Sequence, residues 1–172
     1  GYSRDFQKSF IASHPELKIA VENHLVRIAE KEYPHPERDL YPASIIDTAY
    51  ENLNMITVKW VWDEGGGYSL VNYITGANNF MFGPPCISPD NNFAVGVNCD
   101  LDAGYSPSGF EFCSISQEFI DQHPPFRTRS WGPQKFTWLS DTKGIAYCEM
   151  LDITPDWHYG HFYLKVEVLR DF

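Results

Sequence analysis

The sequence lacks the short motifs by which catalysis can be recognised without a structure. It has no G-x-S-x-G elbow for a nucleophilic serine, and the glycine run Gly65–Gly67 is not followed by the Lys-Ser/Thr pair of a phosphate-binding loop. None of the four cysteines belongs to a C-x-x-C pair, which argues against zinc ribbons and thioredoxin-type redox chemistry. We therefore expect a protein that is not an enzyme and that needs no cofactor.

Long apolar runs and positive charge are also scarce. No stretch approaches the roughly 20 apolar residues that a membrane-spanning helix needs. Lys and Arg total 13 against 23 Asp and Glu, which gives a formal net charge of −10. Nucleic acids and anionic membranes attract positive surfaces, so this balance argues against both as partners. It suits a basic protein partner or a metal cation, although a charge of this sign can also serve solubility alone.

The first residue and the cysteine count bear on the compartment. The chain begins with Gly1 rather than Met, which indicates either a trimmed chain or a mature form, and the mature form would be a periplasmic or secreted protein whose signal peptide has been removed. An exported protein can keep disulfide bonds. Four cysteines permit two disulfides in three connectivities, the alternative being four buried thiols. These cysteines are Cys86, Cys99, Cys113 and Cys148.

The first third of the sequence has the pattern of helices. Ser13 and Glu16 have the spacing of a capping box, with Pro15 in the tolerated first turn. Apolar residues then recur at helical spacing, at Leu17, Val21, Leu25 and Ile28. This predicts a helix that ends by Tyr33, before Pro34. A shorter helix is expected over Arg4–Ala12, and a further turn or two of helix over Ser44–Asn52.

The period changes from helical to two at Met55. Ile56, Val58, Trp60 and Trp62 alternate with other residues, as in a half-buried strand. Gly65–Gly67 is read as a hairpin turn that leads into a second strand. About seven strands are expected, joined by short turns and therefore mostly antiparallel. The strands after the first are predicted at Tyr68–Thr75, Asn92–Val97, Gly109–Ile115, Lys135–Leu139, Gly144–Met150 and Gly160–Leu169.

These patterns predict a single α+β domain over residues 1–172, with a mainly helical segment (1–52) and a β-rich segment (53–172). Ile87–Ala94 and Leu139–Ala146 both place Ser and Asp before an apolar strand, a punctuation common in propeller blades. A closed propeller needs at least four blades of roughly 40 residues, more than residues 53–172 supply. We expect N-terminal helices packed on an incomplete, β-propeller-like arrangement of two or three blade-like sheets.

The order of four motifs resembles an uncharacterised family of small bacterial proteins made with signal peptides. The motifs are Y-x-L-V-N-x-x-T-G, P-x-x-S-P-D, D-x-x-A-G-Y and W-G-P-x-x-x-x-W-L-S-D, at Tyr68–Gly76, Pro85–Asp90, Asp100–Tyr105 and Trp131–Asp141. The resemblance covers roughly half of the chain and rests on structural rather than catalytic residues. It implies an exported protein with blade-like sheets. Some exported proteins of similar size are immunity proteins that neutralise secreted toxins, which is an argument by analogy.

Two places are candidates for binding. Asp100 and Asp102, followed by Gly104, have the beginning of a calcium-loop pattern, although the remaining ligands of such a loop are missing. The alternative is a turn in which the carboxylates accept hydrogen bonds from the local backbone. Trp157 and Tyr159 lie in a polar turn and are the aromatic residues expected to be exposed.

The sequence thus favours a non-catalytic exported protein that binds and inhibits a protein partner, with a basic partner preferred because of the acidic charge. The alternative is a module that binds carbohydrate or the cell envelope through aromatic residues, with calcium at Asp100 and Asp102.

Overall fold

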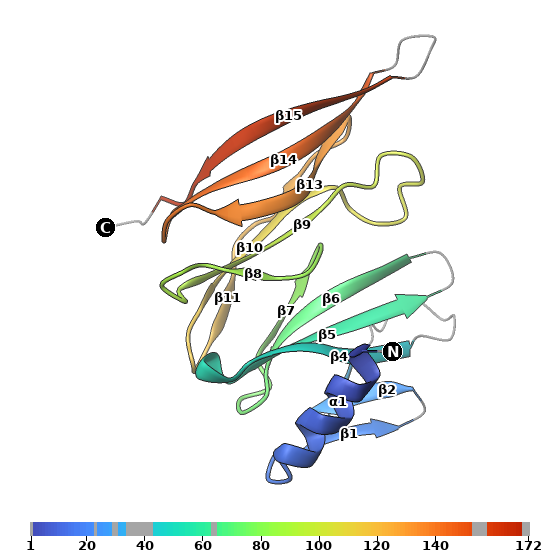
Figure 1. Ribbon diagram of the computed structural model, residues 1–172, viewed down its shortest axis with the longest axis vertical. Coiled ribbons are helices and arrows are strands. Elements are labelled where there is room, and N and C mark those ends of the chain that lie inside the picture. Colours follow the sequence, from blue (N-terminus) through green and yellow to red (C-terminus); the bar gives the residue numbers. More distant parts are fainter. Residues whose placement is uncertain are drawn as a thin grey trace. The chain divides into compact units, whose positions relative to one another are not determined.

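The computed structural model describes residues 2–22, 24–28, 31–33, 43–62, 65–152 and 158–169 (Figure 1). The chain divides into two compact units. The first comprises residues 1–80 and 116–121, and the second comprises residues 81–115 and 122–172. That the whole chain forms one domain stays a prediction. Within the described residues, no helix is long and apolar enough to cross a membrane.

The described residues of the first unit form one α-helix and two sheets. Its elements are α1 (Tyr2–Ser13), β1 (Ile19–Glu22), β2 (Leu25–Ile28), β3 (Lys31–Tyr33), β4 (Ala43–Tyr50), the 3-10 helix η1 (Glu51–Leu53), β5 (Met55–Trp62), β6 (Gly65–Asn72) and β7 (Asn78–Met81). The strand order is β1-β2-β3 in one sheet and β4-β5-β6-β7 in the other. Helix α1 confirms the short helix predicted over Arg4–Ala12.

The core of this unit lies between α1 and strands of both sheets. Phe10 on α1 is 4% exposed and packs with a cluster of buried residues. The other members are Ile19, Val26, Ile28, Ile46, Ile56, Val58, Val71 and Tyr73. The distant segment 116–121 is tied to the same unit by two amide groups. Asn72 Nδ2 donates to the Gln117 carbonyl at 2.8 Å, and Gln117 Nε2 donates to the Asn52 carbonyl at 2.9 Å.

The long helix predicted to run from Ser13 to Tyr33 is wrong. Those residues form β1, β2 and β3, because Val26 and Ile28 are buried at a spacing of two while Leu25 and Arg27 are only partly buried. His24, between β1 and β2, has φ = 66°, a left-handed conformation that no helix interior contains. The turn of helix predicted over Ser44–Asn52 is also wrong, since β4 occupies most of it and only Glu51–Leu53 is helical.

Gly65–Gly67 is not a turn. The three glycines open β6, where Gly65, Gly66 and Gly67 pair with Trp62, Val61 and Trp60 of β5. A Cβ atom on Gly67 would lie 2.4 Å from the Trp60 ring and 2.8 Å from the Phe80 ring. Glycine is needed here because two aromatic rings pack directly onto the strand backbone.

The second unit is built from antiparallel strands. They are β8 (Cys86–Ile87), β9 (Phe93–Asn98), β10 (Gly109–Ile115), the end of β11 (Ile120–Gln122), β12 (Phe126–Arg127), β13 (Trp131–Trp138), β14 (Lys143–Asp152) and β15 (His158–Glu167). One sheet has the order β11-β10-β9-β8, with β12 also paired to β10, and the other has the order β13-β14-β15. The five strands predicted in this part of the chain are confirmed: β10 has the predicted ends, and β9, β13, β14 and β15 have shifted ends.

Apolar side chains from β9, β10, β13 and β14 form the core of the second unit. Its buried members are Val95, Phe110, Phe136, Ala146 and Cys148. On β15, Phe162, Leu164 and Val166 pack against this core, while the residues between them are exposed. This alternation is the period of two by which the strand was predicted.

Over the residues that the structure describes, the protein is therefore mostly β, with one N-terminal helix and four antiparallel sheets. The expectation of several N-terminal helices is corrected to a single one among the described residues. No closed or propeller-like sheet is identified in the part of the chain that the structure describes.

Candidate functional site

The loop between β9 and β10 is organised around the Asp100 carboxylate. Its Oδ1 accepts hydrogen bonds from the backbone N–H groups of Ala103 and Gly104 at 3.2 and 3.0 Å, and its Oδ2 accepts from Ser106 at 2.8 Å. Gly104 has φ = 66°, which lets the chain turn tightly enough for these bonds. Asp100 thus behaves as the backbone-capping residue of a turn.

The same hydrogen bonds set the ionisation of this carboxyl. Burial by itself raises the pKa of Asp100, but the bonds from the backbone N–H groups of Ser106, Gly104 and Ala103 outweigh it and lower the pKa below the usual value. A carboxylate that faces donors is poorly placed to join an oxygen cage around a calcium ion. No group of three or more His, Cys, Asp or Glu side chains suited to a metal ion occurs among the described residues.

Asp102 has a different partner. The Tyr159 hydroxyl donates a hydrogen bond of 2.5 Å to Asp102 Oδ1, across 57 positions of sequence. This hydrogen bond is the main cause that raises the pKa of Tyr159. Two residues that the sequence proposed for binding, Asp102 and Tyr159, are therefore brought together, while Asp100 serves the loop. Trp157 lies outside the described residues.

Tyr159 belongs to an exposed row of rings on the sheet β13-β14-β15. We call Tyr147, Tyr159, His161 and Tyr163 the tyrosine face. Tyr163 is 70% exposed and Tyr159 is 43% exposed. Tyr147 pairs with Tyr163 across β14 and β15, with ring centroids 5.4 Å apart, and stacks on His161 at 5.3 Å. These rings point away from the core because they alternate with its members along each strand.

A shallow hollow adjoins this face. It has a volume of ≈ 400 Å³, enough for a small ligand, and is lined by Lys135, Thr137, Ile145, Tyr147 and Tyr163. Glu149, which pairs with His161 in register, accepts a hydrogen bond of 2.6 Å from Gln134 Nε2. The exposed side of the sheet thus combines aromatic rings with hydrogen-bonding and charged groups, as protein-binding surfaces do.

The four cysteines all lie in the second unit, and each is a free thiol in the structure. Cys113 and Cys148 are buried, whereas Cys86 and Cys99 are partly exposed. Burial raises the pKa of Cys86 and of Cys148. Burial and the nearby Glu149 carboxylate raise the pKa of Cys99 to about 11. Disulfide pairing of these cysteines stays a prediction.

One pair of side chains was missed by the sequence analysis. Ser114 Oγ and His123 Nε2 are 2.8 Å apart, and both line a pocket of ≈ 520 Å³ with Phe93 and Phe112. No motif marks these two residues, since their approach depends on the turn between β10 and β11. Catalysis by serine also needs a group that orients the histidine and donors for an oxyanion. Among the described residues, no second side chain hydrogen-bonds to the His123 ring, so the pair alone does not support a hydrolase.

Comparison with protein-family models, with curated proteins and with solved structures finds no match to this chain.

Proposed function

We propose that this protein is a non-catalytic exported protein that binds a basic protein partner through the tyrosine face and inhibits it. The observation that carries the proposal is the exposure of Tyr159 and Tyr163 on a regular strand. Exposed tyrosines on a rigid element are typical of binding hot spots, because their rings bury a large area and lose little conformational freedom.

The rings of this face are held in place before any partner arrives. The Tyr159 hydroxyl is fixed by Asp102, and the Tyr147 ring contacts the rings of both His161 and Tyr163. A surface that is already ordered pays less conformational entropy on binding. Such pre-organisation supports a tight complex of the kind that an inhibitor or an immunity protein needs.

Charge favours a basic partner. The net charge of −10 attracts a positively charged protein over a distance and raises the rate of association, an effect that salt screens. At the face itself the Asp102 and Glu149 carboxylates and the Lys135 ammonium all lie next to the rings, so the preference for a basic partner rests on the net charge of the chain. The resemblance of the strand motifs to an exported family supports export, and it is also the basis for regarding the antiparallel sheets as blade-like.

The alternative is a module that binds carbohydrate or the cell envelope. The hollow beside Tyr147 and Tyr163 favours it, because sugar rings stack on exposed aromatic side chains and hydrogen-bond to neighbours such as Lys135 and Thr137. We do not include calcium in this carbohydrate-binding alternative, because the Asp100 oxygens accept hydrogen bonds from the loop backbone.

The two functions can be separated by a pull-down from the secreted proteins of the native host and its neighbours. The bait is the tagged protein, compared with Tyr163→Ala and with Tyr105→Ala, which removes a 47% exposed tyrosine from the loop rather than from the sheet. We expect the wild-type bait to capture one basic protein in an amount close to its own, and high salt to abolish this capture. The captured protein should be absent with Tyr163→Ala and present with Tyr105→Ala. Capture that ignores the Tyr163 change contradicts the proposal. A Tyr163-dependent rise in melting temperature with cell-wall oligosaccharides, without protein capture, establishes the alternative.

A further inference from the structure

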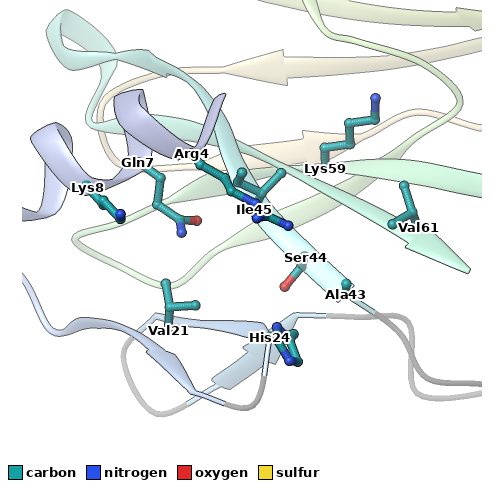
Figure 2. Close-up of a pocket in the computed structure, with 10 residues that line it drawn as sticks. All are labelled: Arg4, Gln7, Lys8, Val21, His24, Ala43, Ser44, Ile45, Lys59 and Val61. Carbon is teal, nitrogen blue, oxygen red and sulfur yellow. The ribbon is translucent and has the colours of Figure 1, made fainter. Parts of the chain in front are cut away.

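The first unit contains a pocket of ≈ 350 Å³ between α1, the β1–β2 hairpin, β4 and β5 (Figure 2). Arg4, Gln7 and Lys8 come from one side of α1, since residues three and four apart share a helix face. His24 comes from the turn after β1, and Ser44 comes from β4. In Figure 2 the Arg4 side chain extends across Ile45 towards Ser44, and His24 lies on the other side of Ser44.

The permanently charged side chains of this pocket are all cationic. Its ten lining residues include three permanent cations, Arg4, Lys8 and Lys59, and include no Asp or Glu. This is the reverse of the chain as a whole, in which acidic residues outnumber basic ones by 23 to 13. Within the described part of the chain neither Arg4 nor Lys8 forms an ion pair, whereas the Lys59 ammonium lies over the Tyr68 ring, 5.8 Å from its centroid.

Two neutral side chains are fixed so that they present donors as well. Gln7 Oε1 accepts a hydrogen bond of 2.9 Å from the Ile46 backbone N–H, which leaves the two N–H groups of its amide as donors. Ser44 Oγ accepts a hydrogen bond of 2.7 Å from the Val26 N–H and keeps its own O–H to donate. Both residues are held by the backbone of buried strands, so their positions do not depend on a ligand.

His24 is placed by an uncommon backbone conformation. Its φ of 66° is left-handed, a conformation that is unfavourable for a residue with a Cβ atom. The Ser44 N–H donates to the His24 carbonyl at 2.8 Å and fixes this turn at the mouth of the pocket. Conformations of this type are concentrated at binding sites, where the surrounding structure maintains them.

The remainder of the lining is apolar. Val21, Ile45 and Val61 contribute aliphatic side chains, and Val21 and Val61 are 41% and 44% exposed. Small-molecule sites usually combine such apolar walls with a few convergent polar groups. A ligand that matches this pocket has one anionic end and an apolar body.

We propose that this pocket binds a small organic anion, with a carboxylate or phosphate group between Arg4, Lys8, Gln7 and Ser44 and an apolar body against Val21 and Val61. The site lies wholly within the first unit, and it is separate from the tyrosine face by which the partner is bound. The proposed anion site therefore adds a ligand to the proposed function. Its test is independent of whether the tyrosine face binds a partner.

The test uses four probes and the whole chain. Phenylacetate, 2-phenylethanol and phenethylamine share one apolar body and carry a negative, zero and positive charge, and inorganic phosphate supplies charge without the body. Binding is followed by calorimetry and by backbone amide shifts in NMR spectra. We expect phenylacetate to bind at least tenfold more tightly than the alcohol and the amine, with shifts at His24 and Ser44, and phosphate to bind more weakly to the same residues. Equal binding of the three phenyl probes, or no binding of either anion, overturns the proposal.

Substitutions locate the binding. Arg4→Gln and Lys8→Gln change exposed side chains on α1 and should leave the fold intact, which the NMR spectrum of each variant verifies. Each should weaken phenylacetate binding about tenfold, or about 1.4 kcal/mol, the loss expected for one charge-assisted hydrogen bond. Lys18→Gln removes an equal charge outside the pocket and should change the affinity less than twofold. If all three variants bind phenylacetate like the wild type, or all three lose affinity equally, the anion is not bound in this pocket.

Discussion

At the scale of single residues, the Asp100 carboxylate determines the shape of the loop between β9 and β10. It accepts three backbone hydrogen bonds, and its pKa is lowered in the folded protein. We expect Asp100→Ala to lower the free energy of unfolding at pH 7 by about 1–2 kcal/mol, because loop N–H groups lose a charged acceptor and gain only water. Urea unfolding of the variant and the wild type measures the difference.

The pH dependence of this loss has a definite sign. A carboxyl whose folded pKa is lowered stabilises the fold above the ordinary Asp pKa, about 3.9, and loses that contribution as the pH falls through the folded value. The gap between wild type and Asp100→Ala should therefore be full at pH 7 and shrink towards pH 2. Asp121→Ala, at an exposed carboxylate outside this loop, is the control and should have no measurable effect at either pH. A gap that is unchanged in acid would show that the ionised carboxylate does not stabilise the loop.

Cys99 is partly exposed, yet it should react slowly. Its Sγ lies 3.9 Å from Glu149 Oε2, and burial together with this carboxylate raises its pKa to about 11. Because the thiolate is the reactive form, alkylation at pH 8 should be at least tenfold slower in the folded protein than in urea. Glu149→Gln removes the negative charge and should accelerate labelling of Cys99.

Peptide mapping by mass spectrometry assigns the label to each cysteine. Glu118→Gln removes the same charge from a loop of the first unit and should leave the rate at Cys99 unchanged. Rapid labelling of Cys99 in the folded wild type, or equal rates in the wild type and Glu149→Gln, would contradict the explanation. A Cys99 that resists labelling even in urea would instead reveal a disulfide, the pairing expected of an exported protein.

At the scale of elements, the sheet β13-β14-β15 depends on a glycine under an aromatic ring. A Cβ atom on Gly144 would lie 2.1 Å from the Phe136 ring, which is 7% exposed and packs edge-on against Trp138 at 5.0 Å. Since the ring has no free space to enter, Gly144→Ala should cost about 1–3 kcal/mol of stability. In Gly160→Ala, the new methyl group would meet only Met150 Cε at 3.5 Å, so this control should stay within about 0.5 kcal/mol of the wild type. Thermal unfolding of both variants measures the contrast, and equal losses would refute the argument.

Strands that bury one face were predictable from the sequence, and the first sheet was not. On β15 the apolar residues Phe162, Leu164 and Val166 alternate with Tyr163, Lys165 and Glu167, so the strand was recognised. In Leu17–Ile28 the apolar residues fit a helical period as well as two short strands. The choice between them depended on the turn at His24 and on burial of Val26 and Ile28 against Phe10, which are contacts distant in sequence.

Some residues of the candidate sites could also be predicted from local sequence patterns, and others could not. Asp100, Asp102 and Tyr159 could be named from local turn patterns, and the structure gives Asp102 and Tyr159 a shared hydrogen bond. Tyr147 and Tyr163 meet only because of the register between β14 and β15, which the sequence does not specify. The basic pocket combines residues from α1, a turn and the three strands β1, β4 and β5, and both β1 and most of β4 were predicted to be helical. No local pattern could have identified it.

At the scale of the whole molecule, the question is whether the two compact units unfold together. The chain passes between them at residues 80–81, 115–116 and 121–122, and the segment 116–121 is held in the first unit by Asn72 and Asn52. If one unit unfolded alone, it would release this segment or strain its connections, so we expect a single cooperative transition.

The distribution of cysteines makes this prediction testable. All four thiols lie in the second unit, so thiol labelling during urea unfolding reports on that unit alone. Ile56→Ala removes a fully buried side chain from the core of the first unit and should cost about 2–5 kcal/mol. If the chain unfolds as one domain, Ile56→Ala lowers the urea midpoint for labelling of Cys113 and Cys148. The decrease should equal the decrease in the midpoint measured by circular dichroism. Ile74→Ala, at a side chain 58% exposed in the same unit, should shift neither signal. Labelling that stays at the wild-type midpoint while circular dichroism shifts would mean that the units unfold separately and that the chain is two domains.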